Sequence, residues 1–234
     1  KKPILGVSLY PEQESMEEIE NYLTMASRYG FTKIFTSMFS VPGTKEEVFD
    51  YFKNFCDLAH KHGMKVSGDC NTAFLKKMGA SESDISIFKE MGIDIIRMDL
   101  PYFDQRDVTL INNPYNITIE LSSCMIQAVR MALENGANPK NFSTCHNFYP
   151  ERYTASDLES IREVNKELSN LGIPSAVFIS SNEENTHGPW PVHDGLPTVE
   201  DHRWIPAELQ VRHWIAVGDV DEIIFGNAFA SEEE

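Results

Sequence analysis

The stretch IDIIRMDL, residues 93–100, joins a strand-like apolar run to charges at alternate positions. Successive side chains of a strand point to opposite sides, so Ile96 and Met98 share one face and Arg97 and Asp99 share the other. A strand with one apolar and one charged face needs a core on one side and polar partners on the other. The rest of the sequence indicates which architecture supplies both.

Seven further runs of β-branched or aliphatic residues repeat along the chain, separated by segments with helical periodicity. Two of these helices begin at capping boxes, Ser15 with Glu18 and Thr44 with Glu47. Eight strand-and-helix units spaced by roughly 25 to 35 residues favour a single α/β fold, the (β/α)8 TIM barrel, over a doubly wound sheet. The first strand is also followed by no phosphate-binding glycine motif. The predicted strands are residues 4–10, 31–39, 64–69, 93–100, 117–121, 142–147, 173–180 and 221–229.

The sequence closes on ASEEE, in which Ser231 and Glu234 have the spacing of one more capping box. This spacing predicts the start of a helix after the eighth strand, but the sequence ends before the helix itself. We expect a TIM-barrel catalytic domain over residues 1–234 that is truncated at or before its eighth helix.

The net charge of −16, from 36 acidic and 20 basic residues, argues against nucleic acid or a membrane surface as the partner. An anionic ligand would need a locally basic site against this overall field. No apolar run is long enough for a membrane span. The four cysteines are widely spaced and lack a CxxC pattern, which favours a reduced, cytoplasmic chain.

Polar residues of one parity recur on the first, third and fifth predicted strands, and most weakly on the sixth. The outside of a barrel has to be apolar to receive helices, so we expect the polar parity to point inward and to end at the C-terminal rim, where barrel active sites lie. One mouth would then be surrounded by Tyr10, Asp69, Asp99, Glu120 and His146.

The inward strand positions carry three carboxylates and one arginine, Arg97. This charge pattern allows three interpretations. The charges can form a satisfied ionic network that fills the barrel interior. An excess of acids at one mouth also suits glycoside hydrolysis, in which one carboxyl is protonated and another ionised. A divalent metal bound by hard oxygen ligands needs the same residues. Parity does not choose between them.

Two loop segments add further hydrogen-bonding groups, CHNFYPERYT at residues 145–154 and the Gly/Pro-rich stretch of residues 184–204. Arg152 and Arg203 in these loops are candidate anion clamps. The histidines of the second loop lack the HExxH spacing of a zinc site, so we interpret them as surface or capping residues.

Several strings resemble the 6-phospho-N-acetylmuramidase (MupG) family: GVSLYPE, GFTKIFTSM, IIRMDLPYF, TIELSS, CHNFYPERYT, GLPTVEDHR and GNAFASEE. They occur in the right order over essentially the whole chain. The resemblance implies a cytoplasmic (β/α)8 barrel that hydrolyses 6-phospho-N-acetylmuramyl-β-1,4-N-acetylglucosamine during recycling of peptidoglycan sugars. It also implies a C-terminal cyclophilin-like β domain that this chain does not contain. Ser122 stands where the family is expected to have Asn, and TASD where it has TGLS.

On this basis Asp99 and Glu120 are the expected catalytic pair, because neighbouring strands lie about 4.8 Å apart and a retaining pair needs roughly 5 to 5.5 Å. Asp69 is the third member, and Asp69 with Glu120 is the competing, inverting pair. The expected ligand is a phosphorylated amino-sugar disaccharide, and no metal or cofactor is expected. The expected substrate-binding residues are Tyr10, Arg97, His146, Asn147, Tyr149, Arg152, Arg203 and Asn227. Two other functions stay open, a metal-dependent sugar-phosphate aldolase or isomerase and a non-catalytic sugar-phosphate binding barrel.

Overall fold

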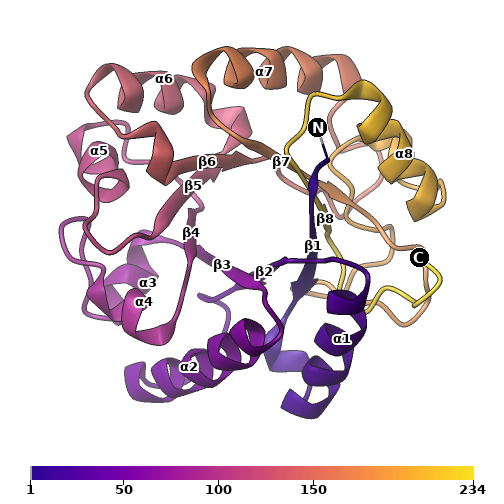
Figure 1. The fold of residues 1–234 in the computed structure, drawn as a ribbon, viewed down its shortest axis with the longest axis horizontal. Helices are drawn as coiled ribbons and strands as arrows, with labels where there is room; N and C mark the ends of the chain where they lie inside the picture. Colours follow the sequence, from indigo (N-terminus) through magenta and orange to yellow (C-terminus); the bar gives the residue numbers. More distant parts are fainter. Residues whose placement is uncertain (1) are drawn as a thin grey trace.

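The computed structural model describes residues 2–234, which form a closed barrel of eight parallel strands inside a ring of helices (Figure 1). The strands pair in chain order, and β1 closes the barrel against β8. All eight predicted strands are present, and the (β/α)8 TIM barrel is confirmed. The strands are β1 (Ile4–Leu9), β2 (Lys33–Ser37), β3 (Lys65–Cys70), β4 (Ile95–Met98), β5 (Thr118–Ser122), β6 (Phe142–Cys145), β7 (Ser175–Ile179) and β8 (Glu222–Phe225).

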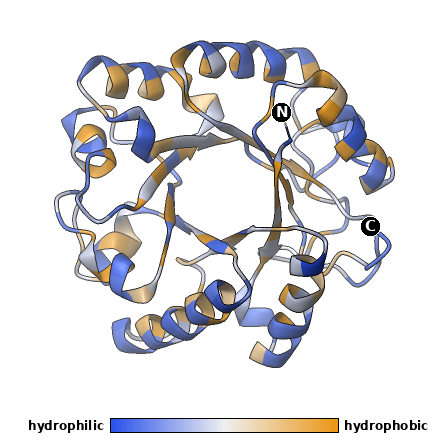
Figure 2. Cartoon of the chain, viewed as in Figure 1, coloured by the Kyte–Doolittle hydropathy of each residue, from blue (hydrophilic) through white to orange (hydrophobic). Residues whose placement is uncertain are grey.

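The helices cover the outside of the barrel and carry both hydrophobic and hydrophilic residues (Figure 2). Both predicted capping boxes form, at Ser15 with Glu18 and at Thr44 with Glu47. The α-helices are α1 (Met16–Arg28), α2 (Lys45–Lys61), α3 (Thr72–Lys77), α4 (Ser86–Met91), α5 (Gln105–Ile111), α6 (Ile126–Glu134), α7 (Leu158–Leu171) and α8 (Ala207–Val217). Short 3-10 helices span Pro11–Gln13 (η1), Ser123–Met125 (η2), Pro139–Asn141 (η3) and Glu200–His202 (η4). None of the helices within residues 2–234 is long and apolar enough to cross a membrane.

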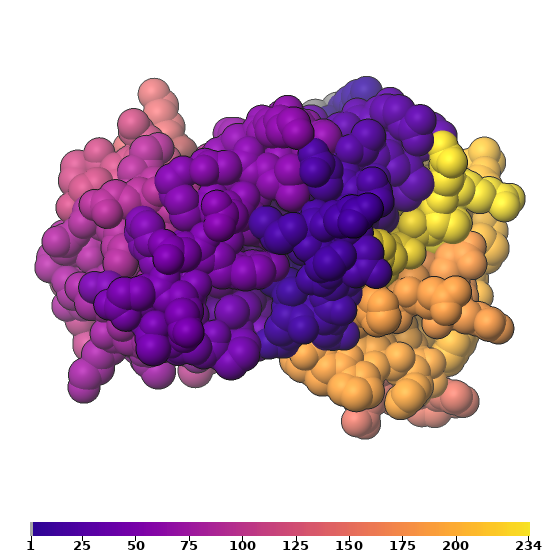
Figure 3. Space-filling model, turned by 90° about the horizontal axis from the view of Figure 1, so that it is seen from below, coloured from indigo at the N-terminus to yellow at the C-terminus, as the bar shows by residue number. Residues whose placement is uncertain are grey.

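Residues 226–234, which follow β8, contain no helix. The amide of Glu234 donates to Ser231 Oγ at 3.2 Å, which is the contact expected at a helix N-cap. Figure 3 shows this C-terminal segment in yellow beside the indigo N-terminal part of the chain. Tyr29, just after α1, donates its hydroxyl to Glu232 at 2.7 Å.

The interior is polar on its β3, β4 and β5 side, as the parity of those strands predicted. Asp69, Arg97, Glu120 and Ser143 are successive register partners on β3 to β6. Because barrel strands tilt by about 36° from the axis, such a row of partners changes depth from strand to strand. Asp69 accordingly lines a cavity at the C-terminal end, whereas Ser143 lines another at the N-terminal end.

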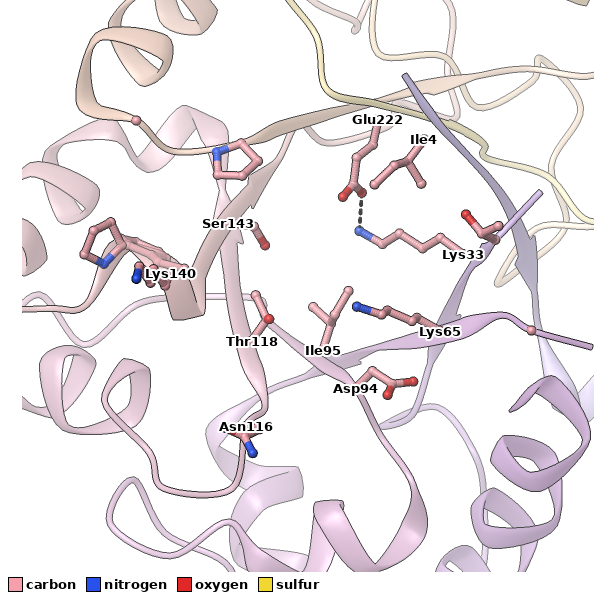
Figure 4. A pocket seen from close by; sticks show the side chains of 16 residues that line it. Ile4, Lys33, Lys65, Asp94, Ile95, Asn116, Thr118, Lys140, Ser143 and Glu222 are labelled. Carbon is pink, nitrogen blue, oxygen red and sulfur yellow. Dashed lines mark hydrogen bonds and ion pairs between the residues drawn. The ribbon is translucent and has the colours of Figure 1, made fainter. Parts of the chain in front are cut away.

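A buried ion-pair cluster separates the two ends of the barrel. Lys33 Nζ lies 2.9 Å from Glu120 Oε2 and 2.5 Å from Glu222 Oε2, so β2, β5 and β8 are joined through one ammonium group. Figure 4 shows Lys33 and Glu222 in the N-terminal cavity, whose volume is about 610 Å³. Burial disfavours the ammonium form, but the two carboxylates outweigh this and raise the pKa of Lys33.

Candidate active site

A cavity of about 330 Å³ opens at the C-terminal end of the barrel and has a polar and an aromatic side. The polar side is built from the ends of β3 and β4 and from the segment after β6. The aromatic side comes from β2, from β7 and from the loop between β7 and α8. The lining residues are Tyr10, Phe35, Ser37, Phe39, Ser40, Asp69, Arg97, Asp99, Asn147, Phe148, Tyr149, Phe178, Pro189 and Trp190.

Arg97 organises the polar side. Its Nη1 donates to Asp69 Oδ1 at 3.3 Å, and its Nη2 donates to Asn147 Oδ1 at 2.6 Å. Ser122 Oγ donates to the same amide oxygen at 3.0 Å, so the oxygen of Asn147 faces Arg97 and Ser122. The Arg97 Nε is buried and has no hydrogen-bond partner among the described residues. The guanidinium therefore keeps one donor that the protein itself does not use.

The two carboxylates of the cavity differ in their surroundings. Burial raises the pKa of Asp69 to about 6, and the charges of Asp99 and Glu120 add to the rise, while Arg97 opposes it. Asp99 lies one residue beyond β4, where its amide donates to Cys70 O at 2.9 Å, and it is exposed to solvent. Asp69 is thus sheltered from solvent and Asp99 is exposed to it. Acid–base chemistry with two carboxyl groups requires such different environments.

Glu120 does not lie at the mouth, contrary to the sequence-based expectation. Its side chain is 1% exposed, and Oε2 accepts hydrogen bonds from Lys33 at 2.9 Å and from Ser143 at 3.3 Å. The predicted parity is correct, because Glu120 points into the barrel. The depth is wrong, because strand tilt places it below Asp69. Glu120 belongs to the interior ionic network that the sequence also allowed.

His146 faces the opposite way from the prediction. Its Nε2 is 2.7 Å from Asn165 Oδ1 on α7, and the residue is buried in the helix layer outside the barrel. On β6 the inward residues are Ser143 and, two positions beyond the strand end, Asn147. Burial lowers the pKa of His146 to about 4, so at neutral pH the ring carries no charge with which to hold an anion.

Arg203 is a structural residue and not a free anion clamp. It is 1% exposed and pairs with both oxygens of Glu200 at 2.7 Å. Its Nη1 donates to the carbonyls of Tyr149 and Asp194 at 2.8 and 3.0 Å. These contacts hold the loop after β6 against the loop after β7, and at 1% exposure the guanidinium is not accessible to a ligand.

Arg152 is exposed, and its Nε donates to Asp194 Oδ1 at 3.0 Å. Its guanidinium carbon lies 5.3 Å from the centre of the Trp204 ring. Arg152 does not line the cavity, but it keeps donors that face solvent.

The three other predicted binding residues have different roles. Tyr10 lines the cavity and donates its hydroxyl to Gly226 O at 2.5 Å, and burial raises its pKa. Tyr149 also lines the cavity. Asn227 does not: it is buried and bonds to the backbone of Ser181 through both amide atoms, which fixes the segment after β7 to the segment after β8.

The aromatic side was missed by the sequence analysis. Phe35, Phe148 and Phe178 form an edge-to-face cluster with ring centres 5.0 to 6.2 Å apart, and Trp190 lies 6.4 Å from Phe148. The inward parity of β2 and β7 was the available signal, since Phe35 and Phe178 both occupy positions on these strands that face the cavity.

Within residues 2–234, no group of three or more His, Cys, Asp or Glu side chains is placed so that it could hold a metal ion. His202 is buried against His213, with Nε2 and Nδ1 2.7 Å apart, and burial lowers its pKa to about 4. The four cysteines are free thiols.

The sequence model described as 6-phospho-N-acetylmuramidase, N-terminal, matches residues 5–234. The chain belongs to this family. No curated protein matches the chain. An uncharacterized protein from B. cereus of known structure shares 36% identity over 100% of the chain, with a TM-score of 0.88. A conserved protein of unknown function from Enterococcus faecalis shares 23% identity over 97% of the chain, with a TM-score of 0.83.

The chain spans 63% and 62% of the length of those two proteins. An enzyme targeting pectin rhamnogalacturonan II is similar in fold alone, with 13% identity over 95% of this chain and 34% of its own, and a TM-score of 0.57. The family match agrees with the resemblance seen in the sequence motifs. The Enterococcus and pectin-enzyme likenesses establish only that the barrel is shared.

Proposed function

We propose that this barrel is the catalytic part of a glycosidase that cleaves 6-phospho-N-acetylmuramyl-β-1,4-N-acetylglucosamine in cytoplasmic recycling of peptidoglycan sugars. The observation that carries the proposal is the pair of acids in one C-terminal cavity, Asp69 sheltered and Asp99 exposed, with Arg97 beside them. Membership of the 6-phospho-N-acetylmuramidase family supports the choice of substrate.

In the proposed mechanism Asp69 is the general acid. Its raised pKa of about 6 keeps a useful fraction of the carboxyl protonated near neutral pH, so that it can protonate the leaving oxygen as the glycosidic bond breaks. Asp99, which is exposed to solvent, acts on the opposite face of the sugar as the nucleophile or as the base that activates water. Glu120 stays in the interior and affects the site only through the charge it places near Asp69.

Two arginines are candidates for the phosphate of the substrate. Arg97 lines the cavity with its guanidinium, whose buried Nε has no partner among the described residues. Arg152 offers exposed donors on the loop after β6. The other predicted donors, His146 and Arg203, are occupied by the contacts described above.

A product assay with phosphorylated and plain MurNAc-GlcNAc disaccharides tests the function. We expect turnover of the phosphorylated compound, unaffected by a chelator, and a loss of about 100-fold or more in kcat for both Asp69→Asn and Asp99→Asn. Asp57→Asn is the matched control, because Asp57 is exposed on α2 and pairs with Lys53 there.

Three results would contradict the proposal. Near-normal turnover by Asp99→Asn would remove that residue from the reaction. Loss of turnover with chelator would favour a metal-dependent aldolase or isomerase, and tight binding without products would favour a binding protein.

A separate test concerns the contact to the phosphate. Arg152→Ala should weaken binding of the phosphorylated disaccharide more than binding of the plain disaccharide. Equal effects on both would exclude Arg152 as the phosphate contact.

A further inference from the structure

Trp190 lies at the open rim of the active-site cavity, on the aromatic side. It is 50% exposed, and its inner edge packs toward Phe148, which in turn contacts the buried Phe178. A half-exposed indole on a packed aromatic base presents a ring surface to whatever enters the cavity. Aromatic ring faces carry partial negative charge and attract polarised C–H groups such as those of a sugar ring.

The backbone that carries Trp190 is held on its N-terminal side by contacts to two other parts of the barrel. Gln13 Nε2 donates to Gly188 O at 2.6 Å, which ties the loop to the segment after β1. His187 and Ala228 exchange backbone hydrogen bonds of 3.2 and 2.7 Å, which tie it to the segment after β8. The indole is therefore positioned before a ligand arrives, which reduces the entropy lost on binding.

The size of the cavity limits what it encloses. At about 330 Å³ it is at the lower end of the roughly 300 to 1,000 Å³ typical of ligand sites. We infer that it encloses one substituted sugar and leaves the second sugar of a disaccharide at the rim. The charged sugar belongs inside, beside Arg97, because Arg97 is the one cationic side chain among the described residues that line the cavity.

We propose that Trp190 is the stacking platform for the second, uncharged sugar, the N-acetylglucosamine of the disaccharide. This rests on the proposed function and adds a residue that sets specificity for a disaccharide over a simple glycoside. Trp204 is a natural control, since it belongs to the same loop and is 58% exposed but does not line the cavity.

The kinetic test compares kcat/KM for the phosphorylated disaccharide with kcat/KM for the methyl β-glycoside of 6-phospho-N-acetylmuramic acid, which lacks the second sugar. Trp190→Ala should lower the disaccharide value about tenfold or more and leave the methyl glycoside within about twofold. Trp190→Phe should restore most of the loss. Trp204→Ala should leave the ratio of the two values as in the wild type. Equal losses on both substrates in Trp190→Ala, or none on the disaccharide, would overturn the assignment.

A second measurement does not depend on turnover. With ¹⁵N-labelled tryptophan the protein shows indole signals from Trp190, Trp204 and the buried Trp214, assigned with single Trp→Phe variants. Adding the disaccharide should shift the Trp190 signal and not the Trp204 signal. Turnover without a Trp190 shift refutes the platform and leaves the function standing. A Trp190 shift without turnover refutes the function and leaves the platform standing, and an absence of both refutes the two together.

Discussion

The two acids of the mouth, Asp69 and Asp99, have different surroundings, because Asp69 is sheltered and Asp99 is exposed. Arg97 opposes the rise that burial causes in the pKa of Asp69. If Asp69 is the general acid, kcat/KM should fall as pH rises above about 6, because the protonated fraction then drops about tenfold per pH unit. Arg97 lowers this pKa, so Arg97→Gln should move the falling limb to higher pH. The measurement is a pH–rate profile of both proteins.

Asp69→Asn serves as the control for that profile, because its residual activity should lack the limb. If the falling limb stays at the same pH in Arg97→Gln, the limb belongs to the titration of a group other than Asp69.

Glu14 is a second acid with a raised pKa, outside the cavity. Both carboxylate oxygens are buried without a hydrogen-bond partner in the described part of the chain, and the imidazole nitrogen His187 Nε2 is 4.0 Å from Oε1. Burial, with the charges of Glu18 and Glu12, raises its pKa to about 7. A raised acid pKa gives stability that is complete below the unfolded-state pKa and is lost as pH rises through the folded-state value.

The free energy of unfolding should therefore fall between about pH 5 and pH 8, and Glu14→Gln should flatten that dependence. At about pH 8 the variant should be more stable than the wild type by about 1 to 3 kcal/mol, because Gln carries no charge and avoids the cost of burying an ionised carboxylate without a partner. Urea unfolding at several pH values measures it. Glu90→Gln, an exposed change on α4, should leave the slope intact, and a slope that survives in Glu14→Gln would point to other groups.

Single residues show what a sequence can and cannot predict about this site. Asp69, Asp99 and Tyr10 line the cavity as expected, because parity and strand ends locate them. His146 was misplaced because the weak alternation of β6 was assigned to the wrong face. Arg203 was misjudged because its partners, Glu200 and the carbonyls of a distant loop, meet only in the folded chain.

At the scale of the elements, Lys33 joins β2, β5 and β8 through a buried ion-pair cluster. Substitutions in this cluster test its effect on stability separately from its effect on catalysis. Lys33→Met should lower the unfolding free energy by about 3 to 5 kcal/mol, because it leaves two buried carboxylates unpaired. Glu120→Gln should cost about 1 to 3 kcal/mol and keep kcat within about tenfold of the wild type. Denaturant unfolding and turnover measured on the same samples provide both numbers. A folded Glu120→Gln protein as inactive as Asp99→Asn would return Glu120 to the catalytic pair.

The loops after β6 and β7 offer a second test at this scale, through Arg203 and Arg152. Arg203→Met removes a buried cation and its contacts to Glu200 and two carbonyls, and it should cost about 3 to 5 kcal/mol of stability. It should also raise KM, because Tyr149 lines the cavity. Arg152→Ala changes an exposed ion pair and should cost less than about 1 kcal/mol. Thermal unfolding separates the two, and equal costs would contradict the structural role of Arg203.

The eight strands and both capping boxes were predictable because local hydrophobic periodicity and side-chain capping determine them. The depth of each inward residue was not, because it depends on strand tilt and on the stagger between strands, which no single strand encodes. That is why Glu120 was expected beside Asp99 and is found next to Lys33 instead.

Over the whole molecule, the charge of −16 acts against an anionic substrate. The sequence suggested a locally basic site to offset it, but the cavity is lined by two acids and one arginine, and Arg97 is paired with Asp69. Arg152 is likewise paired, with Asp194. Within the described residues the mouth therefore offers no net positive charge, and the overall repulsion should dominate the encounter with the substrate.

Salt should consequently speed the reaction. Raising ionic strength from about 0.01 M to about 0.15 M shortens the screening length from about 30 Å to about 8 Å, which weakens the repulsion. We expect kcat/KM for the phosphorylated disaccharide to rise severalfold over this range, while binding of the plain disaccharide, whose one charge is the lactyl carboxylate, changes less. Steady-state kinetics and titration across the salt series measure the two. A fall with salt would mean that Arg97 and Arg152 attract the phosphate more strongly than the 36 acids repel it, and the electrostatics of the mouth would then have to be assigned to those two arginines.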